Sequence, residues 1–223
     1  MSSHLSSDHA VPIEQVAIGP QSLAGDLALP QARTGVVVFA HGSGSSRHSP
    51  RNALVAQVMQ SHGLATLMFD LLTEPEARDR RNVFDVDLLS MRVAGALDWL
   101  QRRADVAELP VGLFGASTGA AAALQAAAQR PERVQAVVSR GGRPDLAGAH
   151  LAQVRAPTLL IVGGNDNDVL ELNQAAARAL VCDKHIEIVP GATHLFAEPG
   201  ALDEVARLAA AWFVRHLQRG DLP

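Results

Sequence analysis

The first residue that could do chemistry is a serine in the segment GASTG at residues 115–119. An apolar run at 111–114 precedes this segment, and an alanine-rich run with high helix propensity follows it at 120–128. A strand, a sharp turn and a helix in this order can hold a serine hydroxyl above a sheet, and only small residues tolerate so crowded a turn. This context predicts that Ser117 is a nucleophile. The simpler alternative is a glycine-punctuated turn with a helix-capping serine.

A serine hydroxyl is a poor nucleophile near neutral pH. It needs an imidazole to take its proton and a carboxylate to orient that imidazole. His194 ends the loop PGATH at 190–194, before the last expected helix, and two aspartates lie in the loop GGNDND at 163–168. We expect His194 to be the base and Asp166 the acid, because Asp166 directly follows a strand. Asp168 stands where the next helix should begin, which suits a helix N-cap.

Another glycine-containing loop, HGSGSS at 41–46, also leaves an apolar run. Its glycines allow backbone N–H groups to turn toward a bound group, and beside a serine nucleophile such a loop commonly supplies an oxyanion donor. We assign the two oxyanion donors to the backbone N–H groups of Ser43 and Thr118, and we expect a structural hydrogen bond from His41. A flexible loop is one alternative. A phosphate-binding loop is a weaker one, because neither a glycine-lysine-serine/threonine ending nor a G-x-G-x-x-G pattern is present.

Four arginines stand on or beside the loops expected near the nucleophile. They are Arg47, Arg51, Arg140 and Arg143. The simpler account is that they stiffen these loops by pairing with nearby acids, such as Asp70, Glu74 or Asp145. Their clustering supports a second hypothesis, in which guanidinium groups recognise a carboxylate on the substrate.

Strands and helices alternate from residue 35 onward. Before that point, residues 13–18 and 23–29 predict an antiparallel hairpin at the edge of a sheet. Later strands are expected at 35–40, 64–69, 111–116, 134–139, 156–163 and 185–189, with helices at 50–62, 84–103, 120–128, 168–180 and 202–217. Residues 74–82 are charged and predict a solvated loop. The alternation predicts a mostly parallel sheet with helices on both faces, whose functional groups gather at the carboxyl ends of the strands.

Length and composition favour one α/β domain with a single large core, because the chain has 223 residues of which 48% are hydrophobic. We expect a flexible tail at 1–12 and a single domain at 13–223. The net charge of −4 argues against nucleic acid or an anionic membrane as the main partner. The start lacks signal-peptide features, no apolar run approaches the roughly 20 residues of a membrane span, and the single cysteine, Cys182, excludes an internal disulfide. These features predict a cytoplasmic protein.

The motifs together resemble those of small α/β-hydrolases of the dienelactone-hydrolase-like group, over the stretch from Gly35 to the final helix. The resemblance is carried by the segments HGSGSSRHSPRN at 41–52, GASTG at 115–119, SRGGRP at 139–144, GGND at 163–166 and GATH at 191–194. It implies an α/β-hydrolase fold and hydrolysis of a small-molecule ester through an acyl-enzyme, with Ser117, Asp166 and His194 as the triad. Dienelactone hydrolases proper carry a cysteine at the position of Ser117, so the resemblance does not extend to dienelactone as the substrate.

The resemblance also implies a class of substrate and leaves one alternative function open. It implies a carboxylesterase, with lactones or thioesters as further substrates. We expect no cofactor, and no bound metal, since no histidine and carboxylate pair shows convincing ligand spacing. Residues 140–155 are too few for the helical cap of many relatives, so we expect little or no cap and an open pocket. A non-catalytic ligand-binding module of the same fold remains the alternative, because fold alone does not establish chemistry.

Overall fold

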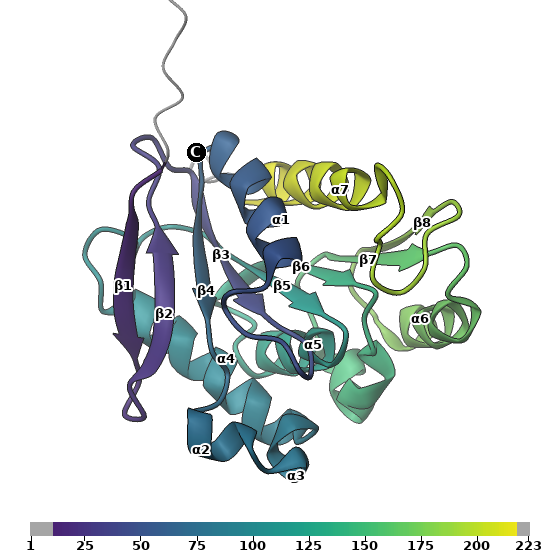
Figure 1. Cartoon of the computed structure of the whole chain (residues 1–223), viewed down its shortest axis with the longest axis horizontal. Coiled ribbons are helices and arrows are strands. Elements are labelled where there is room, and N and C mark those ends of the chain that lie inside the picture. The colour runs from purple at the N-terminus through teal and green to yellow at the C-terminus, as the bar shows by residue number, and fades with distance from the viewer. Residues whose placement is uncertain (1–10, 218–223) are drawn as a thin grey trace, which may run out of the picture.

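The architecture is built on one eight-stranded sheet in the order β1-β2-β4-β3-β5-β6-β7-β8 (Figure 1). The computed structural model describes residues 11–217, so the first ten residues of the predicted tail lie outside it. The strands are β1 Ile13–Ile18, β2 Leu23–Ala28, β3 Gly35–Ala40, β4 Leu64–Phe69, β5 Val111–Ala116, β6 Val134–Arg140, β7 Thr158–Gly163 and β8 Lys184–Val189. The predicted hairpin is confirmed: β1 pairs with β2 antiparallel, and β2 pairs with β4 antiparallel. All remaining pairs are parallel.

The central strands are buried on both faces, as their unbroken apolar sequence requires. In β3, Val36 and Val38 belong to one core, whereas Val37 and Phe39 belong to a second core on the opposite face. This separation follows from the alternation of side chains along a strand. The sheet therefore carries two hydrophobic cores that need helices on both sides.

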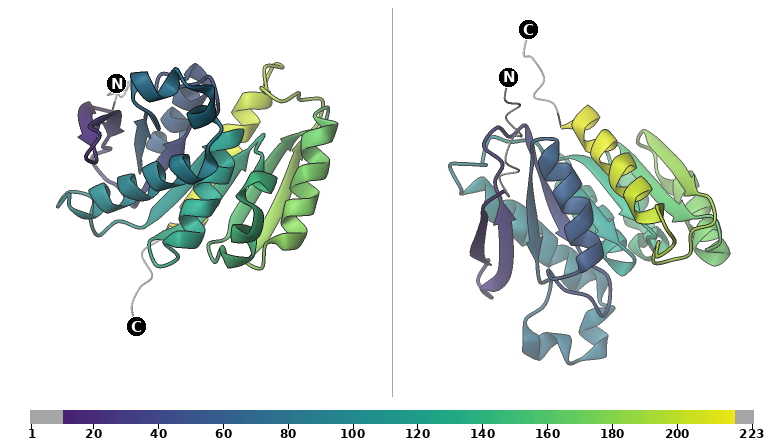
Figure 2. Two further views of the ribbon diagram at one scale, coloured as in Figure 1. Left: turned by 90° about the horizontal axis from the view of Figure 1, so that it is seen from below. Right: turned by 45° about the horizontal axis from the view of Figure 1, so that its top comes forward.

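Helices cover the two faces unequally (Figure 2). The helices α1 and α7 pack side by side over one face, and α4, α5, α6 and the 3₁₀ segment η1 cover the other. Their bounds are α1 Pro50–Ser61, α4 Val86–Gln101, α5 Thr118–Gln129, η1 Pro144–Gln153, α6 Asn167–Ala179 and α7 Ala201–His216. The predicted mostly parallel sheet between two helical layers is confirmed. None of the helices within residues 11–217 is long and apolar enough to cross a membrane.

The expectation of a plain loop at 74–82 is wrong. Two one-turn helices, α2 Glu74–Ala77 and α3 Arg80–Val83, project beyond the carboxyl end of β4 (Figure 1). A capping box begins α2, because the Thr73 side chain accepts from the Glu76 backbone and the Glu76 carboxylate accepts from the Thr73 N–H. The same carboxylate bonds to Arg92 at 2.6 Å, which fastens α2 to α4.

Candidate active site

Ser117 stands on a strained turn between β5 and α5. Its φ of 50° and ψ of −123° lie in a region that non-glycine residues rarely adopt. The turn is possible because its flanking glycines have no side chain: a Cβ on Gly115 would lie 2.7 Å from the Gly119 carbonyl oxygen, and a Cβ on Gly119 would overlap the carbonyl oxygen of Ala40. Although Ser117 occupies the N-cap position of α5, it makes no side-chain capping bond. The alternative of a capping serine is therefore wrong.

The loop after β6 holds the backbone of this turn. The Ser117 N–H donates to the Arg140 carbonyl at 3.2 Å, and the Arg143 N–H donates to the Ser117 carbonyl at 3.0 Å. Gly141, at φ +50°, packs against the backbone of the candidate base, since a Cβ there would lie 3.1 Å from the His194 carbonyl oxygen. These contacts fix the backbone at Ser117 and leave its side chain facing a cavity that His194 also lines.

His194 and Asp166 form a hydrogen-bonded pair between the loops after β8 and β7. The His194 Nδ1 lies 2.7 Å from Asp166 Oδ2, and the Asp166 side chain is 15% exposed. With Nδ1 donating to the carboxylate, Nε2 carries the lone pair that can accept a proton. Asp168 is exposed in the first turn of α6. Its expected N-cap role is wrong, because the helix begins at Asn167 and Asp166 occupies the cap position with its carboxylate turned to His194.

The two residues whose N–H groups are the predicted oxyanion donors, Ser43 and Thr118, are in contact. The Ser43 N–H donates to Thr118 Oγ1 at 2.9 Å, across 75 residues of sequence. Thr118 is the first residue of α5, so its own N–H has no acceptor within the helix. A Cβ on Gly42 would lie 3.0 Å from the Ser117 Cβ, so the lack of a side chain there allows the loop to approach the nucleophile.

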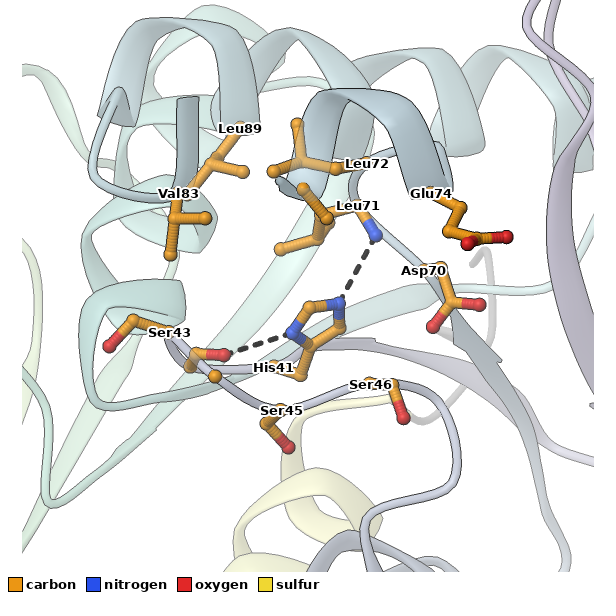
Figure 3. Close-up of a pocket in the computed structure, with 13 residues that line it drawn as sticks. His41, Ser43, Ser45, Ser46, Asp70, Leu71, Leu72, Glu74, Val83 and Leu89 are labelled. Carbon is orange, nitrogen blue, oxygen red and sulfur yellow. Dashed lines mark hydrogen bonds between the residues drawn. The ribbon is translucent and has the colours of Figure 1, made fainter. Parts of the chain in front are cut away.

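His41 orients the oxyanion loop through both ring nitrogens (Figure 3). Its Nε2 accepts from the Leu71 N–H at 3.2 Å, so the ring proton resides on Nδ1, which donates to the Gly42 carbonyl at 3.0 Å. Because a trans peptide directs its C=O and N–H oppositely, this bond aims the Ser43 N–H away from His41. Burial of the ring lowers the pKa of His41. The structural hydrogen bond expected of His41 is confirmed.

Two cavities lie on either side of the oxyanion loop, and both are lined by Gly42, Ser43 and Ser45. The first, here named the apolar cavity, has a volume of ≈ 280 Å³ and is lined also by His41, Leu71, Leu72, Val83 and Leu89 (Figure 3). The second, here named the serine cavity, has a volume of ≈ 270 Å³ and is lined also by Arg51, Asn52, Ser117, Arg140 and His194.

The four loop arginines fall into two pairs. Arg47 bonds to the carboxylate of Asp70 through its backbone N–H, at 2.8 Å, and through its guanidinium. Arg143 is held by both carboxylate oxygens of Asp145, at 2.9 and 2.7 Å. Arg51 and Arg140 instead line the serine cavity. Of the four, only this second pair lines the cavity that Ser117 also lines.

Two asparagines that we did not predict support the site. Asn52 on α1 accepts a hydrogen bond from Arg140 at 3.0 Å, and Asn173 on α6 donates to the Gly142 carbonyl at 3.0 Å. Both are buried. Asn52 ends the segment 41–52 that carries the family resemblance, but for both residues an amide side chain on the inward face of a helix does not indicate the partner.

The described residues hold no cluster of three or more His, Cys, Asp or Glu side chains that could bind a metal ion. Cys182 is half-buried and hydrogen-bonded to Thr158, away from the cavities described above. Burial raises the pKa of its thiol, which disfavours the nucleophilic thiolate.

The sheet order, the two helical layers and the turn at Ser117 define an α/β-hydrolase fold. The sequence model of the dienelactone hydrolase family matches residues 23–218, and the chain belongs to that family. The resemblance inferred from the motifs is thereby confirmed. The crystal structure of a dienelactone hydrolase from Anabaena variabilis is 54% identical, with a TM-score of 0.90 over 94% of this chain and 99% of that one.

More distant and longer relatives complete the comparison. Est1E from Butyrivibrio proteoclasticus shares the fold at 14% identity, with a TM-score of 0.77 over 92% of this chain and 98% of its own. A Mycobacterium tuberculosis protein named "Putative phosphoribosyl transferase" is 59% identical over 203 residues, which are 91% of this chain and 46% of the relative. The chain therefore spans just under half the length of that relative.

Proposed function

We propose that this member of the dienelactone hydrolase family is a serine esterase that cleaves small carboxylic esters through an acyl-enzyme, with lactones and thioesters as further substrates. The observation that carries the proposal is the juxtaposition in one cavity of Ser117, on a strained turn, and His194, whose Nδ1 is held by Asp166 at 2.7 Å. Such a histidine has the tautomer and orientation that a general base requires.

In the proposed reaction, His194 Nε2 takes the Ser117 proton as Oγ bonds to the ester carbonyl carbon. The negative charge that develops on the carbonyl oxygen is stabilised by the N–H groups of Ser43 and Thr118, with the carbonyl oxygen replacing Thr118 Oγ1 as the acceptor of the Ser43 N–H. The C–O bond to the alcohol then breaks, and the alcohol oxygen takes the proton from His194. Water, deprotonated by the same histidine, then attacks the acyl carbon. The bond from this carbon to Ser117 Oγ breaks, Oγ takes the proton back from His194, and the acid is released.

The test is a stopped-flow assay with an activated short-chain ester, together with labelling by a fluorophosphonate. A burst stoichiometric with enzyme, absent from Ser117→Ala and His194→Ala, supports the acyl-enzyme, since removal of either residue leaves only binding and the oxyanion donors. Folded parent protein that gives neither burst nor label would instead favour the non-catalytic binding module.

The name of the mycobacterial relative does not lead us to propose phosphoribosyl transfer for this chain. The family match at 23–218 covers nearly the whole stretch, whereas the relative extends well beyond the shared 203 residues. The site argued above consists of a nucleophile, a base and an acid, which together serve acyl transfer.

A further inference from the structure

Arg140 is a buried cation without an acidic partner. The residue is 6% exposed, and its Nη2 donates to the neutral amide oxygen of Asn52 at 3.0 Å. Its Nε is buried without a hydrogen-bond partner, and within residues 11–217 no carboxylate lies within 4.0 Å of the guanidinium. A buried charge that lacks a counterion is costly, and proteins ordinarily avoid this arrangement.

A second cation lies beside it. Arg51, on the first turn of α1, lines the same cavity, and its Nε is also buried without a hydrogen-bond partner within the described residues. Burial and the charge of Arg51 lower the pKa of Arg140 to about 10. The Phe196 ring, with its centroid 6.0 Å from the Arg140 guanidinium carbon, stabilises the cation from another side but supplies no negative charge. Neither guanidinium group has an acidic partner among residues 11–217, and both arginines line the serine cavity, so their charge is not neutralised by the protein there.

The other two loop arginines show that the chain can supply acids where arginines are structural. Arg47 bonds to Asp70, and Arg143, three residues after Arg140, is held by Asp145. The chain carries 23 acidic residues against 19 basic ones, yet none of the described acids pairs with Arg51 or Arg140. Of the four arginines compared, the two without an acidic partner are the ones that line the cavity with Ser117 and His194.

We propose, building on the esterase function above, that Arg140 and Arg51 form a subsite for an anionic oxygen group on the acyl part of the substrate, with Asn52 positioning Arg140. The recognised chemistry is a carboxylate or a phosphate-type oxyanion, for which the guanidinium fork supplies paired donors. Because both arginines and Ser117 line one cavity of ≈ 270 Å³, the anion and the ester belong to the same small molecule. The preferred substrates are short half-esters of diacids or esters of phosphono-acids.

Binding is measured first without turnover, in Ser117→Ala protein. We expect succinate and inorganic phosphate to raise the Tm at constant ionic strength, whereas neutral succinamide does not. The rise should be lost in Ser117→Ala/Arg140→Met and reduced in Ser117→Ala/Arg51→Met. It should persist in Ser117→Ala/Arg143→Met, whose altered arginine lies only three residues from Arg140 but is paired with Asp145. A rise equal in all four proteins, or absent from the first, would overturn the anion subsite whatever the parent hydrolyses.

Kinetics then identify the anion. Monoethyl succinate, ethyl 3-phosphonopropanoate and neutral ethyl succinamate are compared by titration of released acid. We expect a KM at least about tenfold lower for one or both anionic esters than for the neutral one, as charge-assisted hydrogen bonds would give. The favoured ester distinguishes carboxylate from phosphonate, and Arg140→Met or Arg51→Met should remove the advantage. Equal KM values for all three esters would refute the subsite, whereas hydrolysis of none alongside intact anion binding would refute the esterase function alone.

Discussion

At the scale of single residues, two aspartates two positions apart are distinguished by where α6 begins. Asp166 precedes the helix and turns its carboxylate to His194, whereas Asp168 faces solvent in the first turn. Asp166→Asn should lower kcat by about three to four orders of magnitude, because an amide does not hold the imidazole in the productive tautomer. Asp168→Asn is the matched control and should retain near-parental activity. The reverse ranking in steady-state assays would move the acid to Asp168.

His41 should make stability depend on pH. Its pKa is lowered by burial, so the folded state holds the neutral ring and the unfolded chain binds the proton more readily between the two pKa values. The stability that the neutral ring provides is complete above the unfolded value, about 6.5, and is lost as pH falls below it. Protonation of His41 Nε2 would also direct its new N–H at the Leu71 N–H, from which Nε2 now accepts a hydrogen bond.

The measurement is urea unfolding of the parent and His41→Gln from pH 7.5 to 5. We expect the parent to lose more stability than the variant over this interval, since glutamine has no proton to gain. His62→Gln is a suitable control, because His62 is an exposed histidine at the end of α1. Parallel stability curves for the parent and His41→Gln would show that the buried ring does not titrate differently on folding.

At the scale of elements, the strands and long helices could be predicted because each carries a local signal that agrees with its environment. The runs 35–40 and 64–69 match β3 and β4, since strands buried on both faces need continuous apolar sequence. The short helices were not predicted, for a different reason. The capping box from Thr73 to Glu76 is present in the sequence, but it lies within a charged segment, and α2 has no buried residue. Charge alone thus predicted a loop where capping determines a helical turn.

The glycines of the serine turn give the prediction at this scale. Gly119→Ala should destabilise the protein by about 3 kcal/mol or more and abolish activity, because its Cβ would overlap the backbone of Ala40 at the end of β3. Gly95→Ala is the control: it lies within α4 with no atom within 4 Å of the added Cβ, so it should stabilise by about 0.5–1 kcal/mol. Denaturant midpoints measure both changes. Equal midpoints for the two variants would mean that the turn can relax away from β3.

At the scale of the whole molecule, the site is assembled from segments that only the sheet brings together. The candidate triad could be predicted, because each member follows a strand and parallel strands end at one edge. The contact of Asn52 with Arg140 joins helix α1 to the end of strand β6. Because 88 residues separate the two in the sequence, no local pattern encodes the contact. For the same reason, all four arginines were binding candidates in the sequence analysis. Only the tertiary contacts distinguish the two that pair with aspartates from the two that line the serine cavity.

We expect the two cavities to orient the proposed substrate. With the anionic acyl group at Arg140 and the ester carbon at Ser117, the alcohol part would extend past the oxyanion loop toward the apolar cavity, whose lining includes Leu72, Val83 and Leu89. Each buried methylene contributes about 0.8 kcal/mol, so kcat/KM for monoalkyl succinates should rise about fourfold per carbon from methyl until the cavity of ≈ 280 Å³ is full.

A larger side chain in the apolar cavity should remove this chain-length dependence. Val83→Phe fills space between α3 and the oxyanion loop, so its kcat/KM should stay nearly constant from methyl to hexyl while the methyl ester is cleaved at close to the parental rate. Met91→Phe is the control, because Met91 is 59% exposed on α4 and does not line this cavity. If Val83→Phe and the parent gain equally with each added carbon, the alcohol does not enter the apolar cavity, and the substrate must leave the serine cavity in another direction.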